Sequence, residues 1–172
     1  MNRKLNLTLL LGLALFVSAC ASKPKEGPVV DTTESAAPPA VDNNAFGTGL
    51  SVAELEALGI MGNPLNYKTV YFEYNSSAID RRSEIIAAAH AREIGRTGTS
   101  QVTLEGHADE RGTRDYNLAL GERRAQAVQS LMSNSGAGSA SIRAISYGEE
   151  RPVDSAHNEA AWQKNRRVEI AY

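Results

Sequence analysis

The sequence predicts a sandwich of the α+β or α/β class, in which one sheet packs against helices. Segments rich in β-forming residues alternate with longer segments whose apolar residues recur at helical spacing. Such alternation is typical of a sheet covered by helices, because each element must bury its apolar face against another. About 150 of the 172 residues follow an apolar N-terminal segment, which is enough for one domain with a core and a tail.

The first 19 residues have the features of a secretory signal peptide. Arg3 and Lys4 precede an apolar run over residues 5–17. This run is shorter than the roughly 20 apolar residues that a membrane-spanning helix needs. We therefore expect residues 1–19 to be a targeting segment and not a permanent anchor.

A lipid attachment site is expected at Cys20. The preceding residues, Val17-Ser18-Ala19, resemble the bacterial lipobox, and Cys20 is the only cysteine of the sequence. Several acyl chains, each contributing about 0.8 kcal/mol per buried CH₂ group, would give a durable anchor. Ala21 stands where lipoproteins of the inner membrane often carry aspartate. The resemblance therefore implies an anchor in the inner leaflet of the outer membrane, with the domain in the periplasm.

Residues 20–50 are predicted to be a flexible linker. They are rich in Pro, Ala, Ser, Thr and Gly, and they cannot bury enough apolar surface to offset the entropy of ordering. A linker of about 30 residues extends to about 100 Å and averages about 30 Å as a coil. Without Arg3 and Lys4 the formal net charge falls from −2 to −4, which does not favour nucleic acid as a partner.

The globular domain is expected over residues 51–172 and begins with a short helix. Ser51-Val52-Ala53-Glu54 fits a capping box, in which the serine and glutamate side chains bond each other's backbone amides. The helix is predicted to run through Leu58, because Gly59 and Gly62 follow.

The remaining elements are predicted from composition and periodicity. His90 falls on the apolar face of the first long helix and is expected to be a core or boundary histidine. Val102 and Leu104 alternate inward along a strand, and Leu120 and Val128 belong to an apolar stripe on the second long helix. The predicted ranges are a strand over 68–74, a helix over 82–94, a strand over 101–105, a helix over 116–132, a loop over 133–141, a strand over 142–147, a helix over 158–164 and a strand over 168–172.

The densest polar stretch is the loop over residues 106–113, between the second strand and the second long helix. Loops at strand ends, positioned by a rigid scaffold, are where binding residues concentrate. Gly106 and Gly112 are expected to allow a turn that other residues resist. This loop is therefore the first candidate for a functional site.

Arg124 is unusual because it lies on or beside the apolar face of the helix that follows this loop. An unpaired guanidinium is costly to bury, so the side chain needs a partner. One interpretation is an internal salt bridge to Asp109 or Glu122. The other is a site in which Asp109 and Arg124 face a ligand that carries an amine and a carboxylate, which the planar guanidinium binds well. The residues alone leave both interpretations open.

Several long motifs, in order along the chain, resemble the peptidoglycan-associated lipoprotein family of Gram-negative bacteria and its OmpA-like C-terminal domain. The similarity runs from about Lys68 to Tyr172, and the lipobox and linker agree with it. The motifs are Tyr71–Tyr74, Glu105–Thr113, Tyr116–Ala125, Ser146–Pro152 and Asn165–Glu169.

The resemblance implies an OmpA-like domain, with a mixed four-stranded sheet packed against helices, and a ligand. The ligand is the meso-diaminopimelate of the peptidoglycan stem peptide, whose amine would bind Asp109 and whose carboxylate would bind Arg124. Tyr74 and Leu120 match positions that line the pocket. Asn75 stands where many family members carry aspartate, so we expect binding to survive with a weaker contact to the amine.

The resemblance also implies association with TolB, the β-propeller protein of the Tol system, and a role in envelope integrity and outer-membrane constriction at cell division. A protein-docking module for TolB with little wall binding is the alternative. No cofactor is implied.

Two other chemistries were compared with binding. A murein hydrolase needs two carboxyl groups roughly 5–10 Å apart, whereas Asp109 and Glu110 are neighbours in a loop, where side chains usually point apart. A metal site at His107 and Asp109 would need further ligands that no spacing supplies, so a structural hydrogen bond is expected for His107. The sequence therefore predicts neither an enzyme nor a metal site.

Residues near the C-terminus are expected to have packing or charge-pairing roles. Arg166 and Arg167 precede the last strand, where a solvated or sheet-end ion pair is expected and a wall contact is the alternative. Trp162 is expected to pack, because a single tryptophan on a short helix is more often buried than used for recognition.

Overall fold

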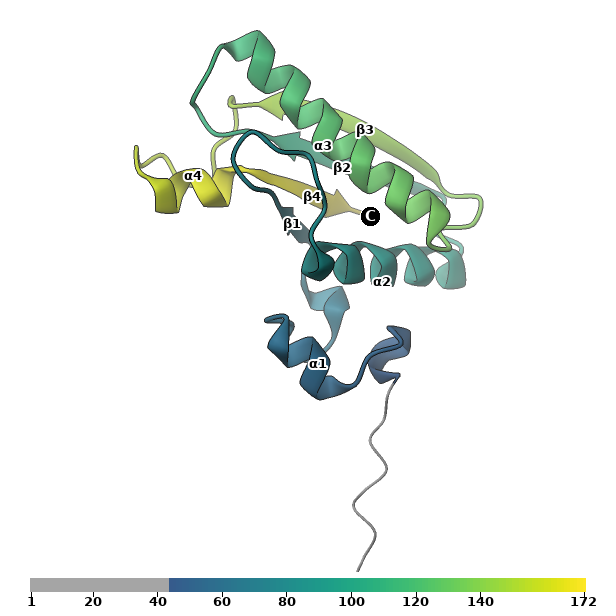
Figure 1. The fold of residues 1–172 in the computed structure, drawn as a ribbon. Helices are drawn as coiled ribbons and strands as arrows, with labels where there is room; N and C mark the ends of the chain where they lie inside the picture. The colour runs from purple at the N-terminus through teal and green to yellow at the C-terminus, as the bar shows by residue number, and fades with distance from the viewer. Residues whose placement is uncertain (1–43) are drawn as a thin grey trace, which may run out of the picture. The chain divides into compact units, whose positions relative to one another are not determined.

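The computed structural model describes residues 44–172, which form a four-stranded sheet with two long helices on one face (Figure 1). β2 (Gln101–His107) and β3 (Ser141–Gly148) are parallel, whereas β4 (Arg167–Ala171) is antiparallel to both of its neighbours. The mixed sheet packed against helices is therefore confirmed. The strands are β1 (Thr69–Tyr71), β2 (Gln101–His107), β3 (Ser141–Gly148) and β4 (Arg167–Ala171), in the spatial order β1-β4-β2-β3.

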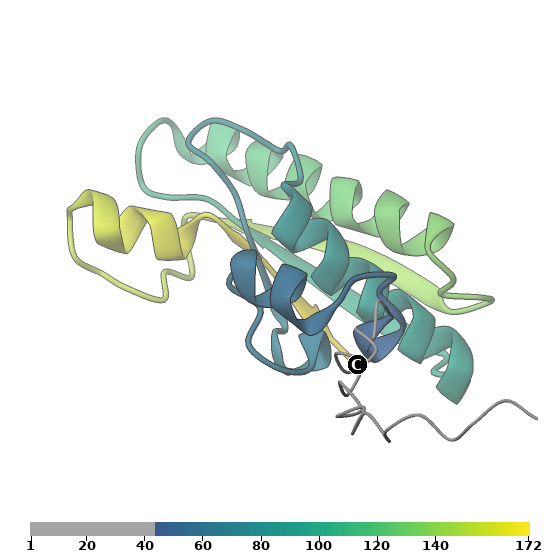
Figure 2. The same ribbon diagram turned by 60° about the horizontal axis from the view of Figure 1, so that its bottom comes forward.

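The two long helices, α2 (Arg81–Thr97) and α3 (Arg114–Asn134), cover one face of this sheet in both Figure 1 and Figure 2. The core lies between the layers, where Ile86, Val102, Leu104 and Val128 are fully buried. No helix within residues 44–172 is long and apolar enough to cross a membrane. The helices are η1 (Ala45–Gly47), α1 (Val52–Ala57), η2 (Pro64–Asn66), α2 (Arg81–Thr97), α3 (Arg114–Asn134) and α4 (Glu159–Asn165), of which the two η elements are single 3-10 turns.

The elements around the polar loop are longer than the sequence predicted. β2 continues two residues further, to His107, because it pairs with β3 as far as Gly148. α3 begins two residues earlier, because the Thr113 side chain accepts a hydrogen bond from the Tyr116 amide and so caps the helix. The loop between them is reduced to residues 108–113, which holds its side chains close to two rigid elements.

Ala45 and Leu50, which precede the expected start of the domain at residue 51, pack in or against the core. Ala45 is only 4% exposed and belongs to the core, and its amide donates to the Leu50 carbonyl. Side chains within the turn also bond its backbone, since Thr48 Oγ1 donates to the Ala45 carbonyl oxygen. The composition of residues 20–50 did not predict this turn, because its hydrogen bonds depend on individual side chains. The capping box at Ser51 is confirmed, whereas residues 1–43, with the predicted signal peptide and Cys20, lie outside the described residues.

Gly106 serves a close approach and not the turn that the sequence suggested. It is absent from the glycines with positive φ, whereas Gly112 has a φ of 120°. A Cβ at position 106 would collide with the carbonyl oxygen of Gly121 in α3. Gly106 and Gly121 therefore let α3 pack directly on β2. This packing brings Arg124, which lies one helical turn after Gly121, against the sheet.

Replacing Gly106 with alanine is expected to lower the free energy of unfolding by about 2 kcal/mol or more, because the added methyl group must push α3 away from β2. Urea denaturation of the purified protein measures this change. Thr103→Ala in the same strand, whose side chain is half-buried, is the control and should cost about 1 kcal/mol or less. Equal effects of the two substitutions would contradict the close-packing argument.

Candidate ligand-binding site

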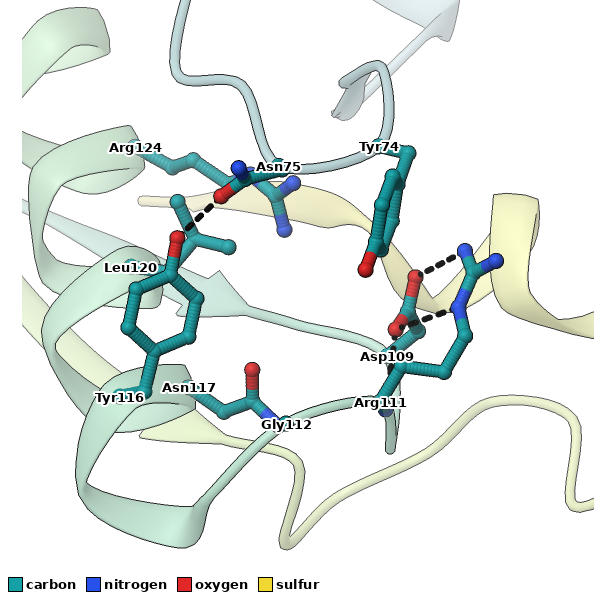
Figure 3. A pocket seen from close by; sticks show the side chains of 9 residues that line it. All are labelled: Tyr74, Asn75, Asp109, Arg111, Gly112, Tyr116, Asn117, Leu120 and Arg124. Atoms are coloured by element: carbon teal, nitrogen blue, oxygen red, sulfur yellow. Dashed lines mark hydrogen bonds and ion pairs between the residues drawn. The ribbon is translucent and has the colours of Figure 1, made fainter.

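The loop after β2, the first turns of α3 and the segment after β1 enclose a cavity of about 160 Å³ (Figure 3). It contains all five residues that the resemblance nominated, and it adds four that were not nominated. The lining residues are Tyr74, Asn75, Asp109, Arg111, Gly112, Tyr116, Asn117, Leu120 and Arg124.

Arg124 is fully buried, and backbone carbonyl groups hold its guanidinium. Nη1 donates to the His107 carbonyl at 2.8 Å, Nε to the Ser76 carbonyl at 2.8 Å and Nη2 to the Glu73 carbonyl at 3.0 Å. These bonds use three of the five N–H groups of the side chain. Two N–H groups are left for another acceptor, on a side chain that lines the cavity.

The internal salt bridge considered for Arg124 does not form within the described residues. Neither Asp109 nor Glu122 pairs with Arg124. Asp109 pairs instead with Arg111 and Arg166. Burial lowers the pKa of Arg124 to about 10, while the nearby negative charge of Asp109 acts in the opposite direction. The side chain is therefore a buried cation at neutral pH, and its own charge is not neutralised by a direct ion pair.

Asp109 is the buried anion of the site, with only 4% of the residue exposed. Its Oδ1 accepts from the backbone amide of Arg111 at 3.1 Å and from Arg111 Nε at 3.2 Å. Its Oδ2 accepts from Arg111 Nη2 at 2.8 Å and from Arg166 Nη1 at 3.2 Å. Burial raises the pKa of the carboxyl group, but the bonds from Arg111 and Arg166 outweigh it and lower the pKa overall.

Arg111 was not nominated from the sequence, although it belongs to the polar loop. Its guanidinium carbon lies 4.1 Å from the ring centroid of Tyr74 and 4.2 Å from that of Trp162. It also pairs with Glu159 of α4 at 3.2 Å. Trp162 is half-buried, which agrees with the packing role predicted for it, but its ring packs against the Arg111 guanidinium beside the site.

Arg166 forms the ion pair that the sequence favoured over a wall contact, and the pair is buried. Its residue exposure is 3%, and it bonds the Phe72 carbonyl, Asp109 and Glu159. This pairing joins residues that are far apart in the sequence, so no local pattern could have indicated it.

Asn75 and Leu120 form the other side of the cavity. Asn75 has a φ of 53°, a left-handed conformation that asparagine tolerates better than most residues. Its Oδ1 accepts a hydrogen bond from the Tyr116 hydroxyl group. Leu120 is 6% exposed and lines the cavity with its apolar side chain. Asn75 therefore has a conformational role in addition to any contact with a ligand.

His107 does not make the structural hydrogen bond expected for it. Within residues 44–172 neither ring nitrogen has a hydrogen-bond partner, and the ring lies 5.5 Å from that of Tyr147. The described part of the chain contains no group of three or more His, Cys, Asp and Glu side chains placed to hold a metal ion. His90, in contrast, is a satisfied core histidine, as expected, bonded to the Tyr172 hydroxyl and the Tyr67 carbonyl.

Comparison with known families agrees with this fold. The model of the OmpA family matches residues 71–166, more than half of the chain, which shows that the chain belongs to the OmpA family. A solved structure of the peptidoglycan-associated lipoprotein from Burkholderia pseudomallei is similar to it, with a TM-score of 0.61 and 38% identity. That similarity covers 64% of this chain and 93% of the solved chain.

Sequence relatives narrow the assignment within the family. The peptidoglycan-associated lipoprotein of Pasteurella multocida is 37% identical over 172 residues, which cover 100% of both chains. The protein of the same name from Pseudomonas aeruginosa is 49% identical over 102 residues, which are 59% of this chain. The chain spans only 60% of that relative's length. These matches place the chain among the peptidoglycan-associated lipoproteins.

Proposed function

We propose that the domain binds peptidoglycan without a covalent bond, by accepting the free amine and carboxylate of meso-diaminopimelate in the cavity. The observation that carries this proposal is the pair of buried opposite charges. Arg124 offers two N–H groups to a carboxylate, and Asp109 offers an anionic acceptor to an amine. Both side chains line the same cavity (Figure 3).

The charges of the cavity favour the end of an amino-acid side chain that carries an amine and a carboxylate over an uncharged sugar ring. Buried Asp109 and Arg124 both line this cavity of about 160 Å³. A carbon bearing one amine and one carboxylate fits this space, while the rest of the stem peptide would lie outside. The relatives' name, which includes peptidoglycan, supports the same ligand.

Hydrolysis of the wall is not supported by the acidic residues of the loop. A glycosidase needs one carboxyl group with a raised pKa to act as the acid. The pKa of Glu110 is lowered, chiefly by its bond to His157 and then by that to Trp162, and the pKa of Asp109 is also lowered. Both groups are therefore ionised at neutral pH, which suits binding and not acid catalysis.

Titration of the purified full chain with a diaminopimelate stem peptide tests the proposal. We expect the peptide to bind, and a stem peptide with lysine instead of diaminopimelate to bind at least about tenfold more weakly, because lysine lacks the carboxylate for Arg124. Asp109→Asn should weaken binding of the diaminopimelate peptide, whereas Asp115→Asn, at an exposed position of α3, is the matched control. Equal affinity for the two peptides would refute the proposed ligand.

Incubation with purified sacculi separates binding from hydrolysis. Sedimentation of the protein with intact sacculi is the expected result. Release of soluble fragments would instead indicate a hydrolase.

We further propose that lipid at Cys20 anchors the domain to the outer membrane, as the relatives' description as lipoproteins supports. Labelling with a fatty acid should mark the chain, and Cys20→Ala should abolish the label. Association with TolB and the role in outer-membrane constriction stay predictions from the family resemblance, and binding of purified TolB to the full chain tests the first of them.

A further inference from the structure

The carboxylate of Asp109 is already saturated with donors. An ionised carboxylate has about four acceptor sites on its two oxygens. In the structure Oδ1 accepts from the amide and Nε of Arg111, and Oδ2 accepts from Arg111 Nη2 and Arg166 Nη1. A ligand amine can therefore bond Asp109 only if one of these donors leaves.

The two arginines differ in their freedom to leave. Arg166 has a side chain only 3% exposed, and its Nε is fixed by the Phe72 carbonyl at 3.0 Å. The side chain of Arg111 is 28% exposed, and it lines the cavity. Arg111 is therefore the donor that a ligand meets first and that can move without opening the core.

Arg111 also has other partners to keep when it leaves Asp109. Its Nη1 lies 3.2 Å from Glu159, whose side chain is 62% exposed. The guanidinium carbon lies 4.1 Å from the ring centroid of Tyr74 and 4.2 Å from that of Trp162, so two aromatic rings contact the cation. A small movement toward Glu159 would keep the cation paired and stacked, which makes its departure from Asp109 less costly.

We propose that Arg111 is a displaceable counter-ion, which occupies the ammonium position on Asp109 in the free protein and gives it up when an amine-bearing ligand binds. The proposal rests on the function proposed above and adds a specificity-determining residue to that site. One cation replaces another on Asp109, so the amine contributes less net affinity than the carboxylate on Arg124 does. Arg111 thereby sets how strongly the site distinguishes diaminopimelate from a side chain that has the carboxylate alone.

Two stem peptides test this idea, one with diaminopimelate and one with 2-aminopimelate, which keeps the side-chain carboxylate and lacks the amine. Calorimetric titration of the full chain gives the dissociation constant of each peptide. The measured ratio is the dissociation constant of the 2-aminopimelate peptide divided by that of the diaminopimelate peptide. In Arg111→Gln the ratio should increase at least about tenfold over the unsubstituted protein, because Asp109 is then free to bond the amine. Loss of the positive charge changes the affinity for both peptides, because both carry the side-chain carboxylate. The ratio therefore isolates the contribution of the amine to binding.

Arg114→Gln is the matched control, because it removes the same charge three residues away, from an exposed side chain paired with Glu150. Its ratio should equal that of the unsubstituted protein. If Arg111→Gln does not fold, Arg111→Lys replaces it, and the ratio should still rise because lysine cannot form the forked contact with Asp109. An unchanged or smaller ratio in the folded variant overturns the inference.

A second measurement follows the side chain itself. The NMR signal of Arg111 Hε should move on saturation with the diaminopimelate peptide and stay in place with the 2-aminopimelate peptide. Equal movement with both peptides would contradict displacement by the amine. Failure of the unsubstituted protein to bind either peptide would instead refute the proposed function, so the two failures are distinguishable.

Discussion

Replacing Arg124 with lysine is expected to weaken binding of a diaminopimelate stem peptide about a hundredfold and to lower the free energy of unfolding by about 3 kcal/mol. The planar guanidinium bonds three backbone carbonyls and has two N–H groups left for a ligand. An ammonium group has only three donors and no planar fork, so it cannot serve the carbonyls and a carboxylate together. Buried carbonyl groups would lose their partners, which explains the effect on stability.

Calorimetric titration and urea denaturation of the same preparation separate the two effects. Arg123→Lys is the control, because the neighbouring arginine is exposed and should change neither quantity measurably. A stable Arg124→Lys protein with unchanged affinity would show that the guanidinium does not hold the carboxylate. A loss of stability with unchanged affinity in the folded fraction would assign Arg124 a structural role alone.

The fold could be predicted because its signals are local. Apolar periodicity places α2, β2, α3 and β3 within a few residues of their observed ends, and Ser51 and Glu54 form the predicted capping box. The strand order could not be derived this way, because the antiparallel insertion of β4 between β1 and β2 depends on contacts between distant segments. Only the family resemblance indicated a mixed sheet. The role of Gly106 could not be predicted either. A glycine is needed there because the Gly121 carbonyl group of α3 packs against it, and this contact joins two distant segments.

The site was predictable in part for the same reason. The polar loop and an arginine on an apolar helix face are visible in the sequence, and they led to Asp109 and Arg124. The pairing of Asp109 with Arg166 is not visible, because Arg166 lies 57 residues away and is brought to the site by the pairing of β4 with β2. The left-handed φ of Asn75 likewise gives this residue a conformational role, because asparagine and aspartate tolerate that region better than most residues. The sequence had suggested only a lost negative charge.

Acidification from pH 6.5 to pH 4 is expected to destabilise the domain, and His107 should account for up to about 3 kcal/mol of the loss. Burial, followed by the positive charge of Arg167, lowers the pKa of His107 from 6.5 to about 4, while Glu169 partly opposes and Arg151 adds to the shift. The unfolded chain therefore binds a proton at a higher pH than the folded domain does. The stabilising contribution is complete above pH 6.5 and is lost as the pH falls toward 4. The pKa of His90 is also lowered, chiefly by burial, so it adds a loss of the same sign.

His107→Phe separates the contribution of His107 from the others. The imidazole ring has no hydrogen-bond partner within residues 44–172 and lies against the ring of Tyr147, so phenylalanine should preserve the packing and cost about 1 kcal/mol or less at pH 7. Urea denaturation at pH 7, 5 and 4 should show a smaller loss of stability in this variant than in the unsubstituted protein. His157→Gln, at an exposed position, should remove only the small part of the loss that its bond to the exposed Glu110 contributes. If His107→Phe kept the full loss, the acid sensitivity would have to come from His90 or from the carboxylates, and the buried imidazole would not be the group that resists protonation.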